Sequence, residues 1–138
     1  MGTARPAKHD WLRELGADEL VDYTAVDFRD AVAQVDVVLD LVGGAYGGRS
    51  LDVLRPGGLL VGAAIDPGVD EATAAARGLR YAWVTAEPAG QALEPVTERI
   101  ETGRLRVAVE RTYPLAEAAE AHRAIEAKRT TGKLVLVP

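Results

Sequence analysis

Apolar and polar positions fall into alternating blocks along the chain, and the two clearest blocks are short apolar runs. Residues 35–42 (VDVVLDLV) and 59–64 (LLVGAA) are almost continuously apolar, which is typical of strands that are buried on both faces of a parallel sheet. A short helix is predicted between them over residues 49–55, and a Pro-Gly-Gly turn ends it. The pattern therefore predicts a strand–helix–strand unit, which winds right-handed onto a parallel sheet.

The same alternation continues on both sides of this unit, with no linker or repeat that divides the chain. It predicts one α/β domain over residues 1–138, because strands and helices take turns throughout. The further predicted helices cover residues 6–15, 27–32 (begun at Thr24 or Asp27), 71–77, 88–102 (begun or kinked at Pro95) and 114–131, and the further strands cover residues 19–23, 80–85, 105–109 and 133–137.

Candidate ligand contacts lie where the two apolar strands end. In an open parallel sheet, ligands bind beyond the carboxyl ends of the strands, which here are residues 40–44 and 62–64. Asp40 is interpreted as a cap for the Gly43-Gly44 turn. No helix is expected to open directly after that glycine pair, so the pair is not interpreted as a phosphate loop. A nucleotide-type ligand is the first hypothesis to test.

Composition narrows the classes of function. The net charge is −5 with 16 Lys and Arg against 21 Asp and Glu, and no basic block is present, which argues against nucleic acid as a partner. The absence of cysteine excludes disulfides and cysteine zinc sites. The two histidines, His9 and His122, are far apart, so no metal site is predicted. His122 is expected on the inner face of a helix, packed or hydrogen-bonded in the core. No run spans a bilayer and no secretory signal is present, so we expect no membrane partner and a cytoplasmic location.

Several motifs resemble one known family. They are LGADELVDY at residues 15–23, DVVLDLVGG at 36–44, LRPGG at 54–58, AAEAH at 118–122 and GKLVL at 132–136. In this order they resemble the cofactor domain and closing segment of medium-chain dehydrogenase/reductases, and the branch that they resemble most is the zinc-independent quinone oxidoreductases.

The resemblance implies only part of a known fold. It is a Rossmann-type doubly wound parallel sheet lacking its first strand and glycine loop, with a C-terminal strand-helix-strand segment. Residues 1–103 would be a partial dinucleotide-binding domain and residues 104–138 would complete a catalytic domain. The chain is thus expected to be truncated at its N-terminus. In the strand order 3-2-1-4-5-6 the missing strand is central, so we expect a homo-oligomer or a complementing chain to cover the exposed edges. The strands at 105–109 and 134–137 are expected to pair with each other.

The resemblance also implies an activity, NADPH-dependent reduction of a small molecule such as a quinone or enone, without zinc. It assigns no catalytic side chain, because the cofactor carries the hydride. The implied cofactor contacts are Thr3, Arg5, Lys8 and Tyr23 at the adenosine 2′-phosphate, Val42, Gly43 and Gly44 at the nicotinamide ribose, and Gly62 and Ala63 at the nicotinamide ring. Two cations and a phenol suit a dianionic phosphate.

Other interpretations remain open. Arg5 and Lys8 could be solvated charges at a helix start. The chain could also be a non-redox binding or assembly protein derived from the reductase fold, since no G-x-G-x-x-G loop occurs in it. A methyltransferase-like fold ranks last, because it needs a glycine-rich motif before the acidic strand and the C-terminal segment does not fit it.

Overall fold

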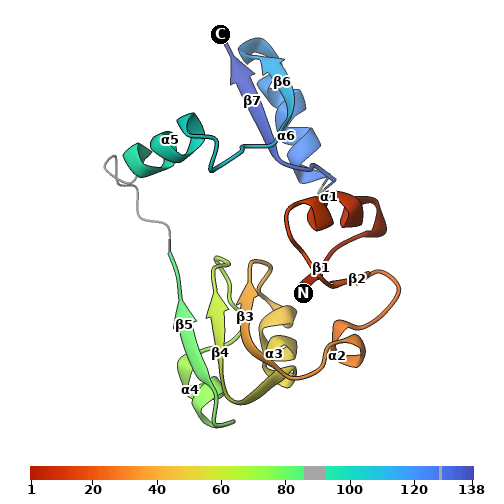
Figure 1. Cartoon of the computed structure of the whole chain (residues 1–138), viewed down its shortest axis with the longest axis vertical. Helices are drawn as coiled ribbons and strands as arrows, with labels where there is room; N and C mark the ends of the chain where they lie inside the picture. The colour runs from red at the N-terminus through yellow and green to blue at the C-terminus, as the bar shows by residue number, and fades with distance from the viewer. Residues whose placement is uncertain (86–92, 128) are drawn as a thin grey trace. The chain divides into compact units, whose positions relative to one another are not determined.

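The computed structural model describes residues 1–85, 93–127 and 129–138, and in these ranges helices and strands alternate (Figure 1). The chain divides into two compact units, Met1–Ala86 and Glu87–Pro138. The first unit contains β1 (Gly2–Thr3), η1 (Pro6–Lys8), α1 (His9–Glu14), β2 (Leu20–Val21), α2 (Phe28–Ala31), β3 (Val35–Asp40), α3 (Ala45–Asp52), β4 (Leu54–Gly62), α4 (Glu71–Ala75) and β5 (Arg80–Trp83). The second unit contains α5 (Leu93–Glu101), β6 (Val109–Pro114), η3 (Leu115–Glu117), α6 (Ala118–Glu126) and β7 (Lys133–Val137).

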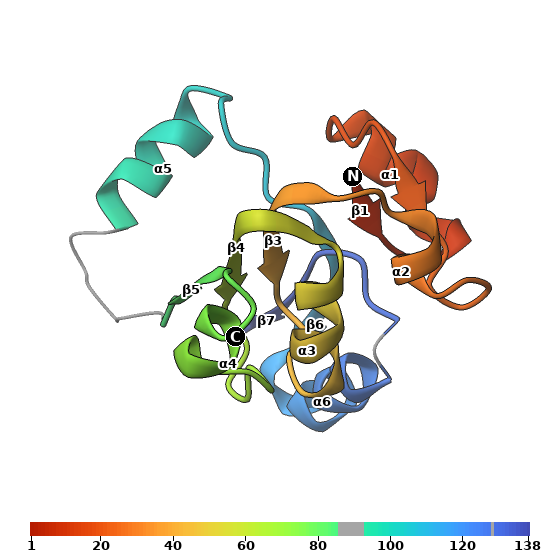
Figure 2. The same ribbon diagram turned by 90° about the horizontal axis from the view of Figure 1, so that it is seen from below.

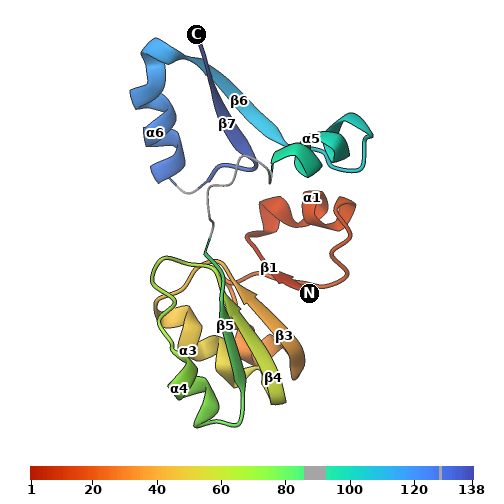
Figure 3. The ribbon, with the colours of Figure 1, turned by 90° about the vertical axis from the view of Figure 1, so that its left-hand side faces the viewer.

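A three-stranded parallel sheet is the centre of the first unit. Its order is β3-β4-β5, and Val61 of β4 lies opposite Leu39 of β3 and Ala82 of β5. Helices α3 and α4 cover one face of this sheet (Figure 2, Figure 3). All pairings between described strands are parallel, so the α/β class with parallel strands is confirmed.

The core lies between the sheet and these two helices. Leu60 of β4 is fully buried and packs with Leu51, Leu54, Ala74 and Leu79. A leucine buried in this way contributes about 1.5–3 kcal/mol of transfer free energy. This cluster holds α3, α4 and the residue before β5 against β4.

Strands β1 and β2 form a separate parallel pair in the same unit. Gly2 lies opposite Leu20, and Val21 of β2 packs with Phe28 and Val53 in a second buried cluster. Among the described strands none joins this pair to β3. That separation agrees with the order 3-2-1-4-5-6 when its central strand is missing.

The prediction that residues 35–42 are buried on both faces is wrong. Val38 faces the core, whereas Val37 is 53% and Leu39 is 61% exposed. The cause is that α3 and α4 lie on the same side of the sheet, so the other face of β3 has no described cover. An apolar run of this length shows that both faces of a strand could be buried. It does not show that other elements cover both faces.

The predicted helix over residues 49–55 begins and ends too late. Helix α3 begins at Ala45, directly after Gly44, so the expectation that no helix opens there is wrong. β4 already begins at Leu54, and a bulge separates the Val35–Leu54 pair from the Val37–Leu59 pair. Gly57 has a φ of +75° within this bulge, which is a conformation that glycine adopts at low cost.

In the second unit, β6 and β7 form a parallel pair that packs on α6. The predicted pairing of the two C-terminal strands is confirmed, but the first of them was placed at residues 105–109 and lies at Val109–Pro114. The Leu105 amide instead donates to the Arg99 carbonyl at 2.9 Å and so closes the end of α5. Tyr113 and Ala121 are the buried side chains between β6 and α6.

Two further predictions concern this unit. His122, expected in the core, is exposed on α6, whose buried residue is Ala121. Pro95 lies in the first turn described for α5, where a proline is tolerated, and residues 88–92 of the predicted helix lie outside the described residues. In the described parts of both units, no helix is long and apolar enough to cross a bilayer.

Candidate functional site

The first group of predicted site residues lies where β1 and β2 end. Arg5 follows β1 and Tyr23 follows β2, and Arg5 Nε donates a hydrogen bond to Tyr23 Oη at 3.0 Å. The parallel pairing of Thr3 with Val21 brings the two residues together across 18 positions of sequence. Both side chains are exposed, with Tyr23 at 41%. The phenol accepts this bond and keeps its own proton for donation to a further acceptor.

The two other residues predicted for a phosphate contact flank Arg5 in the chain. Thr3 is the exposed last residue of β1, and Lys8 is the half-buried last residue of η1. The Lys8 amide donates to the Arg5 carbonyl at 2.9 Å, which closes the turn that carries both cations. The structure thus joins Arg5 directly to Tyr23 and holds Lys8 on the same turn.

His9 is part of this arrangement, although the sequence analysis gave it no role there. Its Nε2 lies 3.0 Å from the carbonyl oxygen of Ala4. A carbonyl can only accept, so the imidazole donates from Nε2. The only signal in the sequence was a polar residue at the start of a helix just after a strand, which is too common to point to a contact.

Asp22 is the acidic residue nearest to this group in the chain. Its carboxylate accepts hydrogen bonds from the Thr24 hydroxyl at 2.6 Å and the Thr24 amide at 2.9 Å. These bonds lower the pKa of Asp22, and the positive charges of His9 and Arg5 lower it further. The carboxylate is therefore charged and already bonded within its own turn.

The second group of predicted residues lies at the ends of β3 and β4. Asp40 is 7% exposed, and its Oδ1 accepts hydrogen bonds from the amides of Val42 at 2.8 Å and Gly43 at 2.9 Å. The Ala63 amide donates to the Asp40 carbonyl at 2.9 Å. The interpretation of Asp40 as the cap of this turn is confirmed. Val42 and Ala63 are exposed beside it.

Two of the three glycines in this second group, Gly43 and Gly62, are required by the packing of the chain itself, whereas a Cβ on Gly44 would meet nothing within 4 Å. A Cβ on Gly43, which has a φ of +71°, would lie 1.9 Å from the Asp66 carbonyl oxygen. A Cβ on Gly62 would lie 2.9 Å from Tyr81 Oη. Gly43 therefore lies against the loop after β4, and a ligand at this turn would meet the exposed neighbours.

Tyr81, which lies beside Gly62 at the end of β4, has an unusual environment. Its hydroxyl is buried and has no hydrogen-bond partner among the described residues. Burial raises its pKa, and the negative charges of Asp40 and Asp70 raise it further. The hydroxyl is therefore neutral, and it fills the space that the missing side chain of Gly62 leaves.

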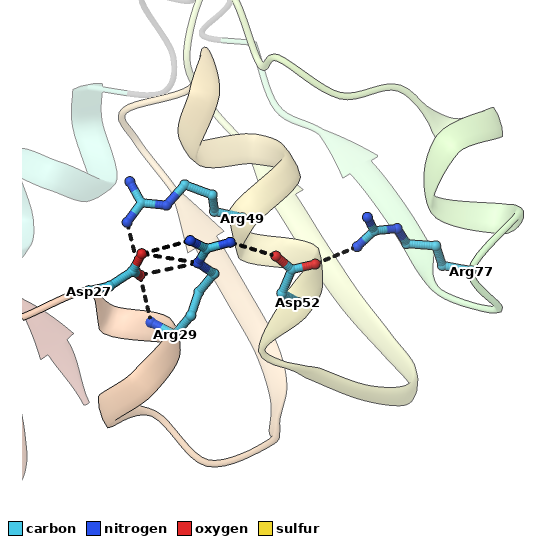
Figure 4. Close-up of polar contacts among 5 residues, drawn as sticks. All are labelled: Asp27, Arg29, Arg49, Asp52 and Arg77. Carbon is cyan, nitrogen blue, oxygen red and sulfur yellow. Dashed lines mark hydrogen bonds and ion pairs between the residues drawn. The ribbon is translucent and has the colours of Figure 1, made fainter.

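A network of charged residues links α2, α3 and Arg77, which follows α4 (Figure 4). Asp27 accepts from Arg29 at 2.8 Å and Arg49 at 2.9 Å, and Asp52 accepts from Arg29 at 3.3 Å and Arg77 at 2.7 Å. Of these residues, only Asp27 has a role predicted from the sequence, as a possible helix cap. The pairs of Arg29 with Asp52, Arg49 with Asp27 and Arg77 with Asp52 join residues that are distant in sequence, which no local pattern predicts.

The network has an effect on protonation. The bonds from Arg29 and Arg49 hold the pKa of Asp27 well below its ordinary value. The bond from Arg77, followed by that from Arg29, lowers the pKa of Asp52. Arg49 also lies over the Phe28 and Tyr46 rings at 5.0 and 4.8 Å from their centroids. These contacts stabilise the fold, and none of the residues that make them belongs to the two groups of predicted site residues.

No group of three or more His, Cys, Asp or Glu side chains that could hold a metal ion occurs in residues 1–85, 93–127 and 129–138. His9 is bonded to a carbonyl, and His122 is an isolated exposed side chain. The expected absence of zinc stays a prediction.

Comparison with known proteins gives one family. The family described as zinc-binding dehydrogenase matches residues 15–136. The quinone oxidoreductase of Pseudomonas aeruginosa is 34% identical over 153 aligned residues, which cover 96% of this chain and 46% of that protein. The NADPH-dependent alkenal/one oxidoreductase of Arabidopsis thaliana chloroplasts is 30% identical, over 99% of this chain and 33% of that protein.

A solved structure shows the same fold. The quinone oxidoreductase from Coxiella burnetii superposes with a TM-score of 0.85 at 30% identity, over 97% of this chain and 43% of that chain. This chain thus spans less than half the length of these relatives.

Proposed function

The chain belongs to the zinc-binding dehydrogenase family, and on that premise we propose that it is the cofactor-binding part of an NADPH-dependent reductase of quinones, enones or similar conjugated carbonyl compounds. Two of the relatives above are named for quinone and alkenal/one substrates. Because the chain covers less than half of each relative, the activity and the substrate of the whole protein are part of the proposal.

The observation that carries the proposal is the Arg5–Tyr23 hydrogen bond at the end of the β1–β2 pair. A guanidinium and a phenol held together offer several N–H and O–H donors to one anion, and charge-assisted bonds of this kind are the strong ones. Lys8 adds a second cation from the same turn. A 2′-phosphate is a dianion that these three side chains suit, whereas recognition of the 2′-hydroxyl in NAD would use a carboxylate. Asp22 is bonded within its own turn to Thr24.

The nicotinamide end of the cofactor is proposed to lie at the second group. Val42 and Ala63 are exposed there, and Asp40 holds the turn between them. Gly44 stays in the proposal as a small residue that allows close approach of the backbone, and Gly43 and Gly62 stay in it as residues that shape the strand ends beside Val42 and Ala63. A bound nicotinamide supplies the hydride, and the role of this chain is to hold and orient it.

The remaining expectations are proposals on the same basis. We propose that the reductase uses no zinc, because two isolated histidines and no cysteine are a poor ligand set. A cytoplasmic location is consistent with a sequence that has no apolar run of membrane-spanning length. A homo-oligomer or a complementing chain is proposed to cover the open strand edges.

The test is a titration of the chain with NADPH and, separately, with NADH, followed by nicotinamide fluorescence. We expect NADPH to bind more tightly, and Arg5→Ala and Tyr23→Phe to weaken NADPH binding by about tenfold or more, the effect of one lost charge-assisted bond. Arg13→Ala is the control, because Arg13 pairs with Asp10 on the exposed surface of α1.

Two results would contradict the proposal. Equal affinity of the parent chain for NADPH and NADH would show that the chain has no site for the 2′-phosphate. Absence of binding at millimolar concentrations of both cofactors, with the chain folded, would favour the alternative of a non-redox binding or assembly protein.

A further inference from the structure

His9 holds the short loop from which both cations of the proposed phosphate site extend. Its Nε2 donates to the carbonyl of Ala4 at 3.0 Å, and the loop between the two residues contains Arg5, Pro6, Ala7 and Lys8. Ala4 is 7% exposed, and its amide donates to the Val21 carbonyl at 3.0 Å. The His9 bond therefore closes the loop onto a residue that the β1–β2 pair already fixes.

The backbone bonds of the loop are local, and one of them is the bond from the His9 amide to the Pro6 carbonyl. The Lys8 amide bonds the Arg5 carbonyl at 2.9 Å, and Pro6 fixes one φ angle. The other end of the loop is set where α1 begins, at His9 itself. Without the imidazole, the loop would keep these local bonds but would lose the side-chain bond that joins the start of α1 to Ala4 at the end of β1.

The position of Arg5 matters because its side chain is shared. Arg5 Nε donates to Tyr23 at 3.0 Å, so the terminal nitrogens of the guanidinium remain for an anion. A small rotation of the loop would break either the Tyr23 bond or the contact with a phosphate. Asp22, whose carboxylate is bonded to Thr24, adjoins Tyr23 in the chain and would attract a displaced Arg5.

We propose that His9 is a positioning residue for recognition of the 2′-phosphate: its Nε2–H bond to Ala4 sets the loop so that Arg5 and Lys8 face one anion. The inference rests on the proposed function, because it concerns the same site. It adds a residue that touches no part of the cofactor and that determines the preference between phosphorylated and unphosphorylated ribose.

The experiment uses two probes that differ only in the 2′-phosphate, adenosine 2′,5′-bisphosphate and 5′-AMP, in calorimetric titrations of the full chain. We expect His9→Ala and His9→Asn to weaken binding of the bisphosphate about tenfold, the effect of one lost hydrogen bond, and to leave 5′-AMP binding unchanged. A shorter asparagine keeps a polar side chain but does not reach the Ala4 carbonyl. His9→Gln places an amide N–H near the position of Nε2 and should restore the preference.

A second measurement is made on the parent chain itself, and a variant serves only to assign the signal. Imidazole 15N shifts of the parent chain should show His9 with its proton on Nε2, and the spectrum of His9→Gln identifies the signal, since His122 is the only other histidine. A proton on Nδ1 alone would overturn the inference.

The outcomes separate the two proposals. Equal weakening of both probes, or no weakening of either, in a parent chain that prefers the bisphosphate would overturn the role of His9 and leave the proposed function intact. A parent chain that binds both probes equally would refute the proposed function, and the inference about His9 would fall with it.

Discussion

The carboxylate of Asp40 accepts a hydrogen bond from the amide of Gly43 at 2.9 Å and thereby holds a glycine whose φ is +71°. The short turn from Leu41 to Gly44 then leads from the end of β3 to the start of α3. The bond thus connects a buried carboxylate with a glycine in the left-handed conformation, and both residues belong to the second group of predicted site residues.

The first prediction concerns this acid. Asp40→Ala should destabilise the chain by about 1–3 kcal/mol, because two amides of the turn lose their acceptor. Asp40→Asn should cost less, since its amide oxygen can still accept. Urea denaturation of the two variants measures the difference, and equal midpoints for Asp40→Ala and the parent chain would show that the turn holds without its cap.

The second prediction compares two glycines that lie five residues apart. Gly43→Ala should cost about 2 kcal/mol or more, because alanine is strained at this φ and its Cβ would collide with the Asp66 carbonyl. Gly48→Ala is the matched control: a Cβ there meets nothing within 4 Å, and the position lies within α3. It should stabilise the helix by about 0.5–1 kcal/mol. Thermal unfolding of both variants tests the pair, and similar shifts would contradict the close approach at Gly43.

The third prediction compares two leucines in neighbouring strands. Leu60 is 0% exposed, and Leu60→Ala should cost about 2–5 kcal/mol through the cavity that it leaves. Leu39 is 61% exposed, and Leu39→Ala should change the free energy of unfolding by about 0.5 kcal/mol or less. Denaturant midpoints at low protein concentration give both values. A large loss for Leu39→Ala would mean that another surface covers this face of β3.

These two leucines also show how far the sequence leads. The apolar runs identified both strands and their parallel pairing, because length and composition distinguish buried strands from helices. They did not reveal that Leu39 is exposed, since the number of helices that cover a sheet depends on the whole topology. Asp40 was predictable as a cap because its partners lie within three residues.

Contacts between distant segments were not predictable in the same way. Arg29 meets Asp52 across 23 positions of sequence, and Tyr81 fills the space beside Gly62. No local pattern encodes such pairs. The Arg5–Tyr23 contact came from a family resemblance, and the bond between His9 and Ala4 is local but depends on the geometry of a turn that the sequence does not specify.

The fourth prediction concerns acid. The folded chain lowers the pKa of Asp27 and of Asp52 below the ordinary value of 3.8. A carboxyl group whose pKa is lowered on folding contributes stability that is complete above the unfolded pKa and that disappears as the pH falls through the folded pKa. The contribution should thus be full above about pH 5 and decline progressively below about pH 4.

The measurement is the urea midpoint of the parent chain, Asp27→Asn and Asp52→Asn between pH 6 and pH 2. Each variant should be less stable than the parent at pH 6 and should lose less stability as the pH falls. The double variant should show the weakest dependence. Parallel curves for the parent and the variants would mean that these exposed ion pairs do not contribute measurably.

The fifth prediction concerns self-association. β3 is an outer strand of its sheet, and no described strand pairs with its other edge. Val37 and Leu39 are exposed on the face that α3 and α4 leave open. An unpaired edge with apolar side chains promotes pairing with a second copy, and a lysine on such an edge opposes it. Light scattering should therefore show a mass that rises with concentration, and Leu39→Lys should lower it toward that of one chain. Ile125→Lys, at a residue of helix α6 that is 55% exposed, is the control and should keep the mass of the parent. A parent chain with the mass of one copy at every concentration would contradict the prediction and would favour a different, complementing chain at this edge.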